Sequence, residues 1–84
     1  MTVEEEQYFE SHVQNMRNLM FTHFQIEDGM FSKELLPLLT LYNIEKATNK
    51  LMDLFVYLQD HAEEVANKKE YLIKSMINYL DPRF

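Results

Sequence analysis

Residues 34–42 read Glu-Leu-Leu-Pro-Leu-Leu-Thr-Leu-Tyr and constrain the fold of this chain more than any other segment. A helix on the surface of a globular protein needs a polar stripe along one side. This segment offers only Glu34 and Thr40 as polar side chains, so it must be covered on more than one side. The chain's own helices, a second copy of the chain or another protein can provide this cover, and the sequence leaves all three alternatives open.

The composition is typical of a folded, helical chain. Its 84 residues suffice for one domain, and 46% of them are apolar, with one glycine and two prolines. We therefore predict a single all-α domain over residues 1–84, in which short connections make neighbouring helices antiparallel in a compact bundle of four. The expected helices cover residues of about 3–25, 33–42, 44–66 and 68–80, and the second is short and strongly apolar.

Local signals set the limits of the first helix. Thr2 and Glu5 have the spacing of a capping box, in which each side chain accepts a hydrogen bond from the backbone of the other. Gly29, the only glycine of the chain, is expected to end the helix by adopting the left-handed conformation.

Further caps are expected for the other three helices. Ser32 and Asn43 are suitable N-caps for the second and third helices, and Pro37 should delay or bend the second. Asn67 has the capping-box spacing that starts the fourth helix. An alternative break between the third and fourth helices uses Asp60 as the cap.

Three of the expected helices carry apolar residues at spacings of three and four, which places each set on one face of its helix. These faces predict most of the hydrophobic core. They comprise Phe9, Val13, Met16, Met20 and Phe24 in the first helix; Ile44, Ala47, Leu51, Leu54, Phe55, Leu58, Ala62 and Val65 in the third; and Leu72, Ile73, Met76, Ile77 and Leu80 in the fourth.

The formal net charge is −6, and it is unevenly distributed. Residues 1–34 contain seven acidic residues and two basic ones, whereas residues 35–84 contain seven acidic and six basic residues. The acidic first part repels phosphates and anionic lipids, so we expect no direct binding to nucleic acid or membrane. A basic protein is the electrostatically favoured partner.

Several kinds of chemistry are excluded or disfavoured by residue usage. The absence of cysteine excludes disulfides and thiolate metal sites, and a single glycine cannot build a phosphate-binding loop. The serines Ser11, Ser32 and Ser75 lie in expected helices or at a cap, and not on the strained turn of a nucleophilic serine. We therefore expect no enzyme activity, no catalytic residues and no cofactor.

The localisation is expected to be cytoplasmic. The first residues are acidic where a signal peptide would be basic, and no apolar run approaches the roughly 20 residues of a membrane-spanning helix.

Two histidine and glutamate pairs share a helix face, as bundle metal sites require: His23 with Glu27, and His61 with Glu64. Residues 22–28, Thr-His-Phe-Gln-Ile-Glu-Asp, also resemble a short segment of the hemerythrins, which implies a di-iron centre in a four-helix bundle. The hemerythrin centre needs five histidines, and this chain has three. A metal-binding bundle is therefore kept as an alternative, and no metal ligand is assigned.

These observations lead to a functional hypothesis. We expect a small, acidic, non-enzymatic protein–protein interaction or regulatory protein that acts through an apolar surface around the second helix, with homodimerisation through the same surface as an open alternative. An acidic mimic of nucleic acid that inhibits an enzyme, or an immunity-type protein, is a further alternative. The expected partner-binding residues are Met30, Phe31, Leu35, Leu38, Leu39 and Tyr42.

Overall fold

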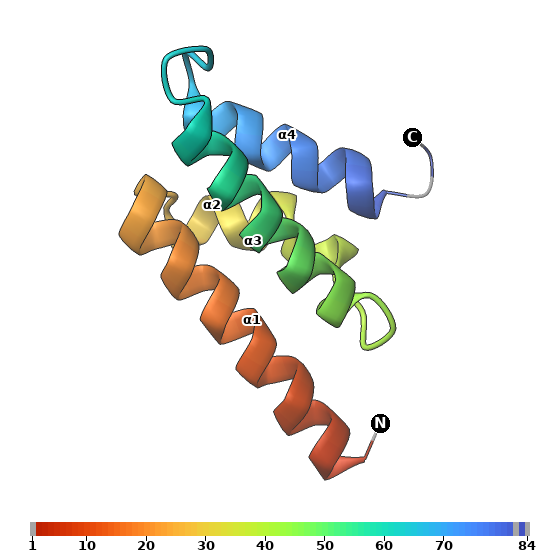
Figure 1. The fold of residues 1–84 in the computed structure, drawn as a ribbon. Helices are drawn as coiled ribbons and strands as arrows, with labels where there is room; N and C mark the ends of the chain where they lie inside the picture. Colours follow the sequence, from red (N-terminus) through yellow and green to blue (C-terminus); the bar gives the residue numbers. More distant parts are fainter. Residues whose placement is uncertain (1, 82, 84) are drawn as a thin grey trace.

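The computed structural model describes residues 2–81 and 83. The described part of the chain contains four α-helices, one short 3-10 helix and no β-strand, which confirms the predicted all-α fold with four helices (Figure 1). The elements are α1 (Val3–Phe24), α2 (Asp28–Glu34), the 3-10 helix η1 (Leu36–Leu38), α3 (Ile44–Asp60) and α4 (Lys68–Leu80).

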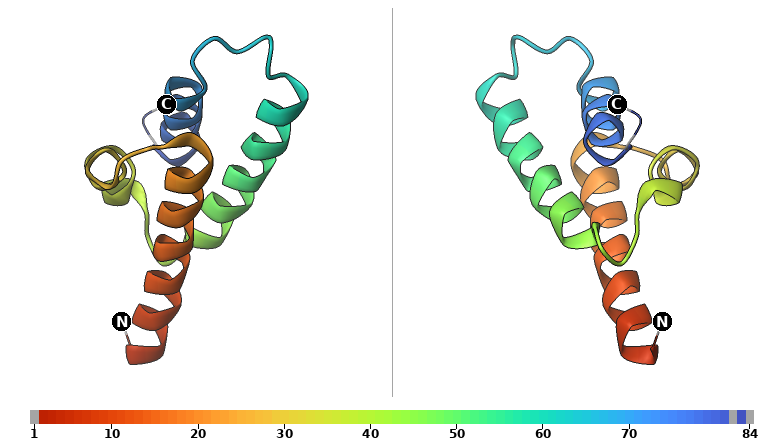
Figure 2. Two further views of the ribbon diagram at one scale, coloured as in Figure 1. Left: turned by 90° about the vertical axis from the view of Figure 1, so that its left-hand side faces the viewer. Right: turned by 90° about the vertical axis from the view of Figure 1, so that its right-hand side faces the viewer.

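Helix α3 lies in the middle of the molecule and packs against α1 and α4 (Figure 1). Helices α1 and α3 run in the same direction in all views, and α4 crosses α3 on the way back (Figures 1 and 2). The neighbouring helices are therefore not all antiparallel, because α2 and η1 separate α1 from α3 along the chain.

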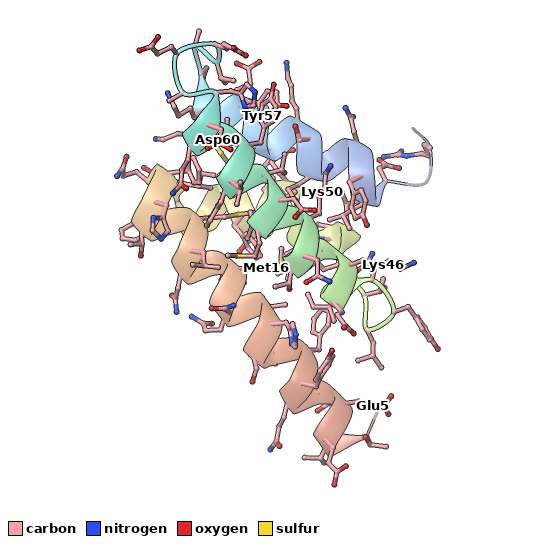
Figure 3. The ribbon with its side chains drawn as sticks, viewed as in Figure 1. Glu5, Met16, Lys46, Lys50, Tyr57 and Asp60 are labelled. Carbon is pink, nitrogen blue, oxygen red and sulfur yellow. The ribbon has the colours of Figure 1, made fainter. Side chains whose placement is uncertain are left out.

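The core is formed by all four helices and by the segments that join them. It contains most of the apolar positions predicted for α1, α3 and α4, of which Met16 lies between α1 and α3 (Figure 3). The buried side chains are Val13, Met16, Met20, Ile26, Phe31, Leu35, Leu39, Ile44, Ala47, Leu51, Leu54, Phe55, Leu58, Leu72, Ile73 and Met76.

The first turns of α1 project beyond the other helices (Figures 1 and 2). Residues 2–8 are all exposed, and Glu5 lies near the projecting end (Figure 3). The predicted capping box is confirmed, since Glu5 N–H donates to Thr2 Oγ1 (3.1 Å) and Thr2 N–H donates to Glu5 Oε1 (3.0 Å). Local hydrogen bonds, and not packing, therefore hold this end of the helix.

The predicted end of α1 at about residue 25 is confirmed, since the helix ends at Phe24 with Gln25 as its C-cap, but the terminating residue is Gln25 and not Gly29. Gln25 adopts the left-handed conformation (φ 52°), and its N–H donates to Phe21 O (2.9 Å). The reason is tertiary, because a turn at this point carries the next residue, Ile26, into the core, where it is 2% exposed. Gly29 instead lies inside α2 with a negative φ.

We expect Gly29→Ala to stabilise the protein by about 0.5–1 kcal/mol, since glycine within a helix is less favourable than alanine by this amount. A Cβ atom added at Gly29 would meet nothing within 4 Å. Urea denaturation of the wild type and the variant measures the difference. A loss of stability would contradict the structure and would instead agree with a left-handed glycine at this position.

The predicted second helix over residues 33–42 is wrong in its limits. Helix α2 occupies Asp28–Glu34, η1 follows at Leu36–Leu38, and Leu39 is extended (φ −84°, ψ 135°). Pro37 explains the break, because a proline has no backbone N–H to continue the hydrogen bonds of α2 and suits the first turn of a new helix. Ser32 is accordingly inside α2 and is not an N-cap.

Helix α3 begins at Ile44 as predicted but ends at Asp60, six residues before the expected end at 66. The position agrees with the alternative break, although Asp60 is the last residue of α3 and does not cap a new helix. A helix that continued to residue 66 would place Glu63 and Glu64 in its last turn, where negative charge is unfavourable. Helix α4 starts as predicted, with Glu70 N–H donating to Asn67 Oδ1 (3.0 Å).

Asp81 follows the last residue of α4, and its side chain is buried (4% exposed) against Arg83. Arg83 Nη2 donates to Asp81 Oδ2 (2.7 Å), and the Arg83 backbone N–H donates to Asp81 Oδ1 (3.0 Å). These hydrogen bonds stabilise the ionised form and hold the pKa of Asp81 at about 2, below its ordinary value of 3.8.

We therefore expect the carboxylate of Asp81 to titrate at about pH 2 when it is followed by carbon-13 NMR. Because its pKa is lowered in the folded state, its stabilising contribution is present above pH 3.8 and is lost as the pH falls toward 2. Arg83→Gln should raise the pKa of Asp81 toward 3.8, whereas Arg17→Gln should leave it unchanged. A wild-type midpoint near 3.8 would contradict the contact between Asp81 and Arg83.

Candidate functional site

The six residues that the sequence assigned to partner binding fall into two groups. Three belong to the core, namely Phe31 (1% exposed), Leu35 (0%) and Leu39 (6%), so they are unavailable to a partner unless the fold opens. Leu38 is half-buried, whereas Met30 and Tyr42 are 45% and 92% exposed. The chain itself therefore covers most of the leucine-rich segment, and only Met30 and Tyr42 of the six predicted residues are exposed.

Met30 lies in a groove of about 410 Å³ between α2 and α4. Ile73 and Ile77 of α4, four residues apart and so on one face of that helix, provide the rest of its apolar floor. The charged side chains that line it are Glu34, Lys69, Glu70 and Lys74, together with the polar Asn67. We call this feature the α2–α4 groove.

The charges around the α2–α4 groove are balanced, with two acidic and two basic side chains in a protein of net charge −6. Lys74 Nζ lies 2.6 Å from Glu70 Oε1. The hydrogen bond and the charge of Lys74 lower the pKa of Glu70 below its ordinary value. The groove is therefore an apolar strip bordered by acidic and basic side chains, two of which form an ion pair.

The sequence identified Ile73 and Ile77 only as core residues. Ile73 is buried at 8% exposure, and Ile77 is half-buried at the edge of the core. The apolar face of α4 contains five residues, which is broader than packing against α3 alone requires. In the sequence, the width of this apolar face was the feature that could have indicated a second contact surface on α4.

Tyr42 stands at the end of a loop between η1 and α3 that is fixed by hydrogen bonds. Asn43 Oδ1 accepts from Thr40 N–H (2.8 Å), Asn43 N–H donates to Thr40 Oγ1 (3.2 Å), and Asn43 Nδ2 donates to Leu38 O (2.8 Å). Asn43 occupies the predicted N-cap position of α3, but its side chain makes no capping hydrogen bond and holds this loop instead. We call residues 39–43 the Tyr42 loop.

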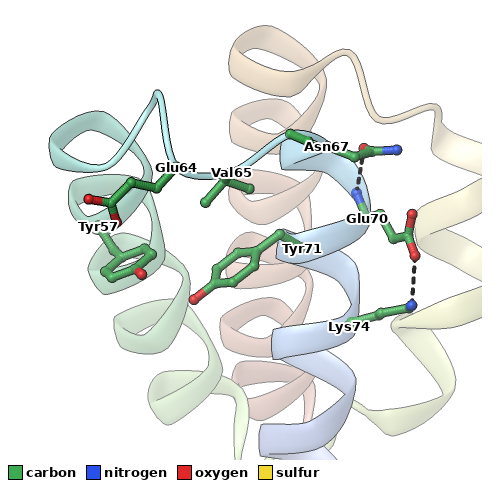
Figure 4. Close-up of a pocket in the computed structure, with 8 residues that line it drawn as sticks. Tyr57, Glu64, Val65, Asn67, Glu70, Tyr71 and Lys74 are labelled. Atoms are coloured by element: carbon green, nitrogen blue, oxygen red, sulfur yellow. Dashed lines mark hydrogen bonds and ion pairs between the residues drawn. The ribbon is translucent and has the colours of Figure 1, made fainter.

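A second depression, of about 450 Å³, lies where α3 leads into α4 (Figure 4). Its aromatic wall contains Tyr57, which is stacked on Tyr71 with ring centroids 5.6 Å apart, and on His61 at 4.2 Å. The neighbouring Tyr71, and to a smaller extent Glu64, raise the pKa of Tyr57, because they disfavour its negatively charged phenolate.

Tyr71 and His61 both stack on Tyr57 where α3 packs against α4, and we call this contact the α3–α4 seam. Rings from the chain itself already stack on Tyr57, and Lys50 Nζ covers the ring of Tyr79 further along the same seam (5.4 Å). This seam offers a ligand less free aromatic surface than its content of three tyrosines suggests.

The histidines do not form a metal site in the described part of the chain. His23 packs edge-on against Phe55 (5.4 Å), and His61 stacks on Tyr57, with its Nδ1 lying 3.0 Å from Tyr57 O. Within residues 2–81 and 83, no three histidine, aspartate or glutamate side chains are arranged to hold an ion. The short resemblance to hemerythrins at residues 22–28 is therefore not accompanied by their ligand arrangement.

Comparisons with known proteins identified no protein that is similar to this chain. No protein-family model matches the chain, and neither the curated proteins nor the solved structures gave a match. Among the helices described, none combines the length and the apolar character needed to cross a membrane.

Proposed function

We propose that this chain is a small, acidic, non-enzymatic interaction protein that binds a protein partner at the α2–α4 groove. The observation that supports this proposal is the open apolar floor formed by Met30, Ile73 and Ile77. Exposed apolar surface flanked by charged side chains is typical of interaction sites. Of the residues expected from the sequence, Met30 is the one retained in this groove.

The shape and chemistry of the groove suit an amphipathic helix from the partner. Such a helix places apolar side chains three and four residues apart into a groove between two helices. Burial of apolar surface contributes about 25 cal/mol per Å², so a short contact of this kind binds weakly unless further residues join it. The balanced charges of Glu34, Lys69, Glu70 and Lys74 would fix the orientation of the helix more than its affinity.

The acidic start of α1 supports a basic partner. Glu4, Glu5, Glu6 and Glu10 are all exposed, and Arg17 is the first basic side chain after them apart from His12. Surface charge of one sign accelerates the encounter with a partner of opposite charge. The partner is therefore expected to associate more slowly as the salt concentration rises.

The surroundings of the ionisable groups support a non-catalytic role for the groove. The ionisable groups around the groove are exposed to water, and the lowered pKa of Glu70 makes it a weaker general base near neutral pH. Catalytic groups are usually desolvated so that their pKa values approach the working pH.

A photo-crosslinking experiment in host cells tests the proposal. A benzophenone amino acid placed at Met30 (45% exposed) should form an adduct with the partner, and the same probe at Met52 of α3 (46% exposed) should not. Excess wild-type protein and the Met52→Asp variant should suppress the adduct at Met30. The Met30→Asp variant should not suppress it.

Equal adducts from the probes at Met30 and Met52 would overturn the assignment of the α2–α4 groove. Adducts from neither position would overturn it as well. An adduct at Met30 that contains only this chain identifies the partner as a second copy, and an adduct that contains a different protein identifies a heterologous partner.

The alternative of an acidic nucleic-acid mimic has less support. Successive residues of a helix point about 100° apart, so Glu4, Glu5 and Glu6 cannot form a row at the spacing of phosphates. Three lysines, Lys68, Lys69 and Lys74, also place positive charge on α4. No observation favours an immunity-type activity over general partner binding.

A further inference from the structure

The methionines of this chain differ in how far water can reach them. The structure describes five of the six, and three of these have no exposed surface, namely Met16, Met20 and Met76. The other two, Met30 of α2 and Met52 of α3, are 45% and 46% exposed. A reagent dissolved in water can therefore reach two of the described methionines while the protein stays folded.

Methionine is also the side chain of this protein that peroxides oxidise most readily. Cysteine thiolates usually compete for such oxidants, and the chain contains no cysteine. The thioether sulfur of methionine gives an electron pair to one oxygen of hydrogen peroxide, so that an S–O bond forms as the O–O bond breaks. The sulfur is oxidised by two electrons, and the second oxygen leaves as water after it takes up the proton of the first.

The oxidation changes the character of the side chain without removing it. The thioether is flexible and apolar, whereas the sulfoxide is polar and disrupts the apolar contacts that methionine makes. Methionine sulfoxide reductases, one for each epimer of the sulfoxide, restore the thioether. An exposed methionine can therefore carry a reversible change in polarity.

Met30 and Met52 differ in what this change would affect. Met30 lines the α2–α4 groove, where Ile73 and Ile77 form the rest of the apolar floor. A sulfoxide oxygen at Met30 places a polar group in this floor, and covering a polar group with an apolar occupant is costly unless a hydrogen bond is made to it. Met52 lies on α3 and does not line this groove, although it is exposed to the same extent.

We propose that Met30 is a reversible oxidation site, and that its conversion to the sulfoxide by peroxide weakens the binding of a protein partner at the α2–α4 groove. The inference rests on the proposed function of the groove as a protein-binding site and adds its regulation. It holds for any partner that packs apolar side chains on the floor, because these side chains would meet the sulfoxide oxygen. A bound partner in turn covers Met30 and slows its oxidation, whereas Met52 stays accessible.

Peptide mass spectrometry after timed exposure of the purified protein to hydrogen peroxide tests the chemical part of the proposal. Met30 and Met52 should be oxidised at similar rates, whereas the three buried methionines should react about tenfold more slowly or less, because the fold must open before peroxide reaches them. In protein unfolded by urea, all five should react alike. Equal rates for Met30 and Met16 in the folded protein would overturn the proposal.

A competition experiment tests the effect on the groove. The chain that carries the benzophenone amino acid at Met30 forms its adduct in a lysate of host cells. A separate, purified competitor is oxidised and freed of peroxide with catalase before it is added, so that the partner itself is not oxidised. Unoxidised wild type should suppress the adduct, and oxidised wild type should need a concentration about tenfold higher or more for the same suppression. Treatment with methionine sulfoxide reductases should restore the oxidised competitor.

Two leucine variants assign the effect to one side chain. Leucine is apolar and similar in volume to methionine, and it cannot form a sulfoxide. Oxidised Met30→Leu should therefore compete as well as the unoxidised protein, whereas oxidised Met52→Leu should compete as weakly as oxidised wild type. Circular dichroism of each competitor should give the same helical content before and after oxidation, and a loss of helix on oxidation of Met30 would assign the effect to unfolding and overturn the proposal.

Oxidised wild type that competes undiminished would also overturn the proposal, as would weak competition by oxidised Met30→Leu or full competition by oxidised Met52→Leu. These outcomes leave the proposed function in place, because the unoxidised protein still suppresses the adduct. An absence of adducts at Met30, or an adduct that unoxidised wild type does not suppress, rejects the two proposals together.

Discussion

Leu35→Ala is expected to lower the free energy of unfolding by about 2–5 kcal/mol, the range observed for leucine truncation in well-packed cores. Leu35 has no exposed surface, and its N–H donates to Phe31 O (3.0 Å) at the end of α2. Its removal leaves a cavity at the junction of α2 and η1. Domains of this size have about 5–15 kcal/mol of stability in total, so the loss is a large fraction of it.

The matched control is Met30→Ala, because Met30 lies on the same helix but is 45% exposed. Its effect on the free energy of unfolding should stay within about 0.5 kcal/mol, as for most surface substitutions. Urea denaturation followed by circular dichroism measures both variants. Equal and small effects of the two substitutions would show that Leu35 is not a core residue and would return it to the set of interface candidates.

Phe31→Ala is expected to cost about 3–5 kcal/mol, the range for truncation of a buried aromatic ring. Phe31 is 1% exposed, and the guanidinium of Arg17 lies 5.3 Å from the centre of its ring. Arg17 Nε also lies 3.3 Å from Asp28 Oδ1, so the ring, the guanidinium and the carboxylate join α1 to α2. Removal of the ring therefore loosens the contact that holds α2 in place.

Phe21→Ala is the control for this prediction, since Phe21 of α1 is 62% exposed. Its effect should stay within about 0.5 kcal/mol. Thermal or urea denaturation gives the comparison. If Phe31→Ala proved no more destabilising than Phe21→Ala, the position of α2 against α1 would be wrong, and with it the α2–α4 groove.

Local signals were sufficient to predict α1, the start of α3 and α4. The capping residues Thr2 and Asn67 act over three residues, and the apolar spacing of three and four acts over single turns, so neither depends on the rest of the fold. The end of α1 near residue 25 was also predicted, but the residue that takes the left-handed conformation was not. The chain turns at Gln25 because Ile26 must reach the core, and a contact of that kind is set by distant residues.

The leucine-rich segment shows why the site was only partly predictable. Its residues were expected to form one continuous helix, in which the leucines would point in all directions and leave an apolar face uncovered. Pro37 divides the segment, and the bent path lets Leu35 and Leu39 both turn into the core. The reason for expecting an interface at these two leucines disappears, and the surface that remains combines Met30 of α2 with Ile73 and Ile77, more than 40 positions later in the sequence.

The projecting start of α1 has a consequence for how this sequence can change over time. Because residues 2–8 are all exposed, substitutions there are limited mainly by helix propensity and by the reciprocal pair Thr2 and Glu5. We expect divergent relatives to vary freely in these turns. A common ancestry would then be recognised from the spacing of the buried Met16 and Met20 and not from the amino-terminal residues.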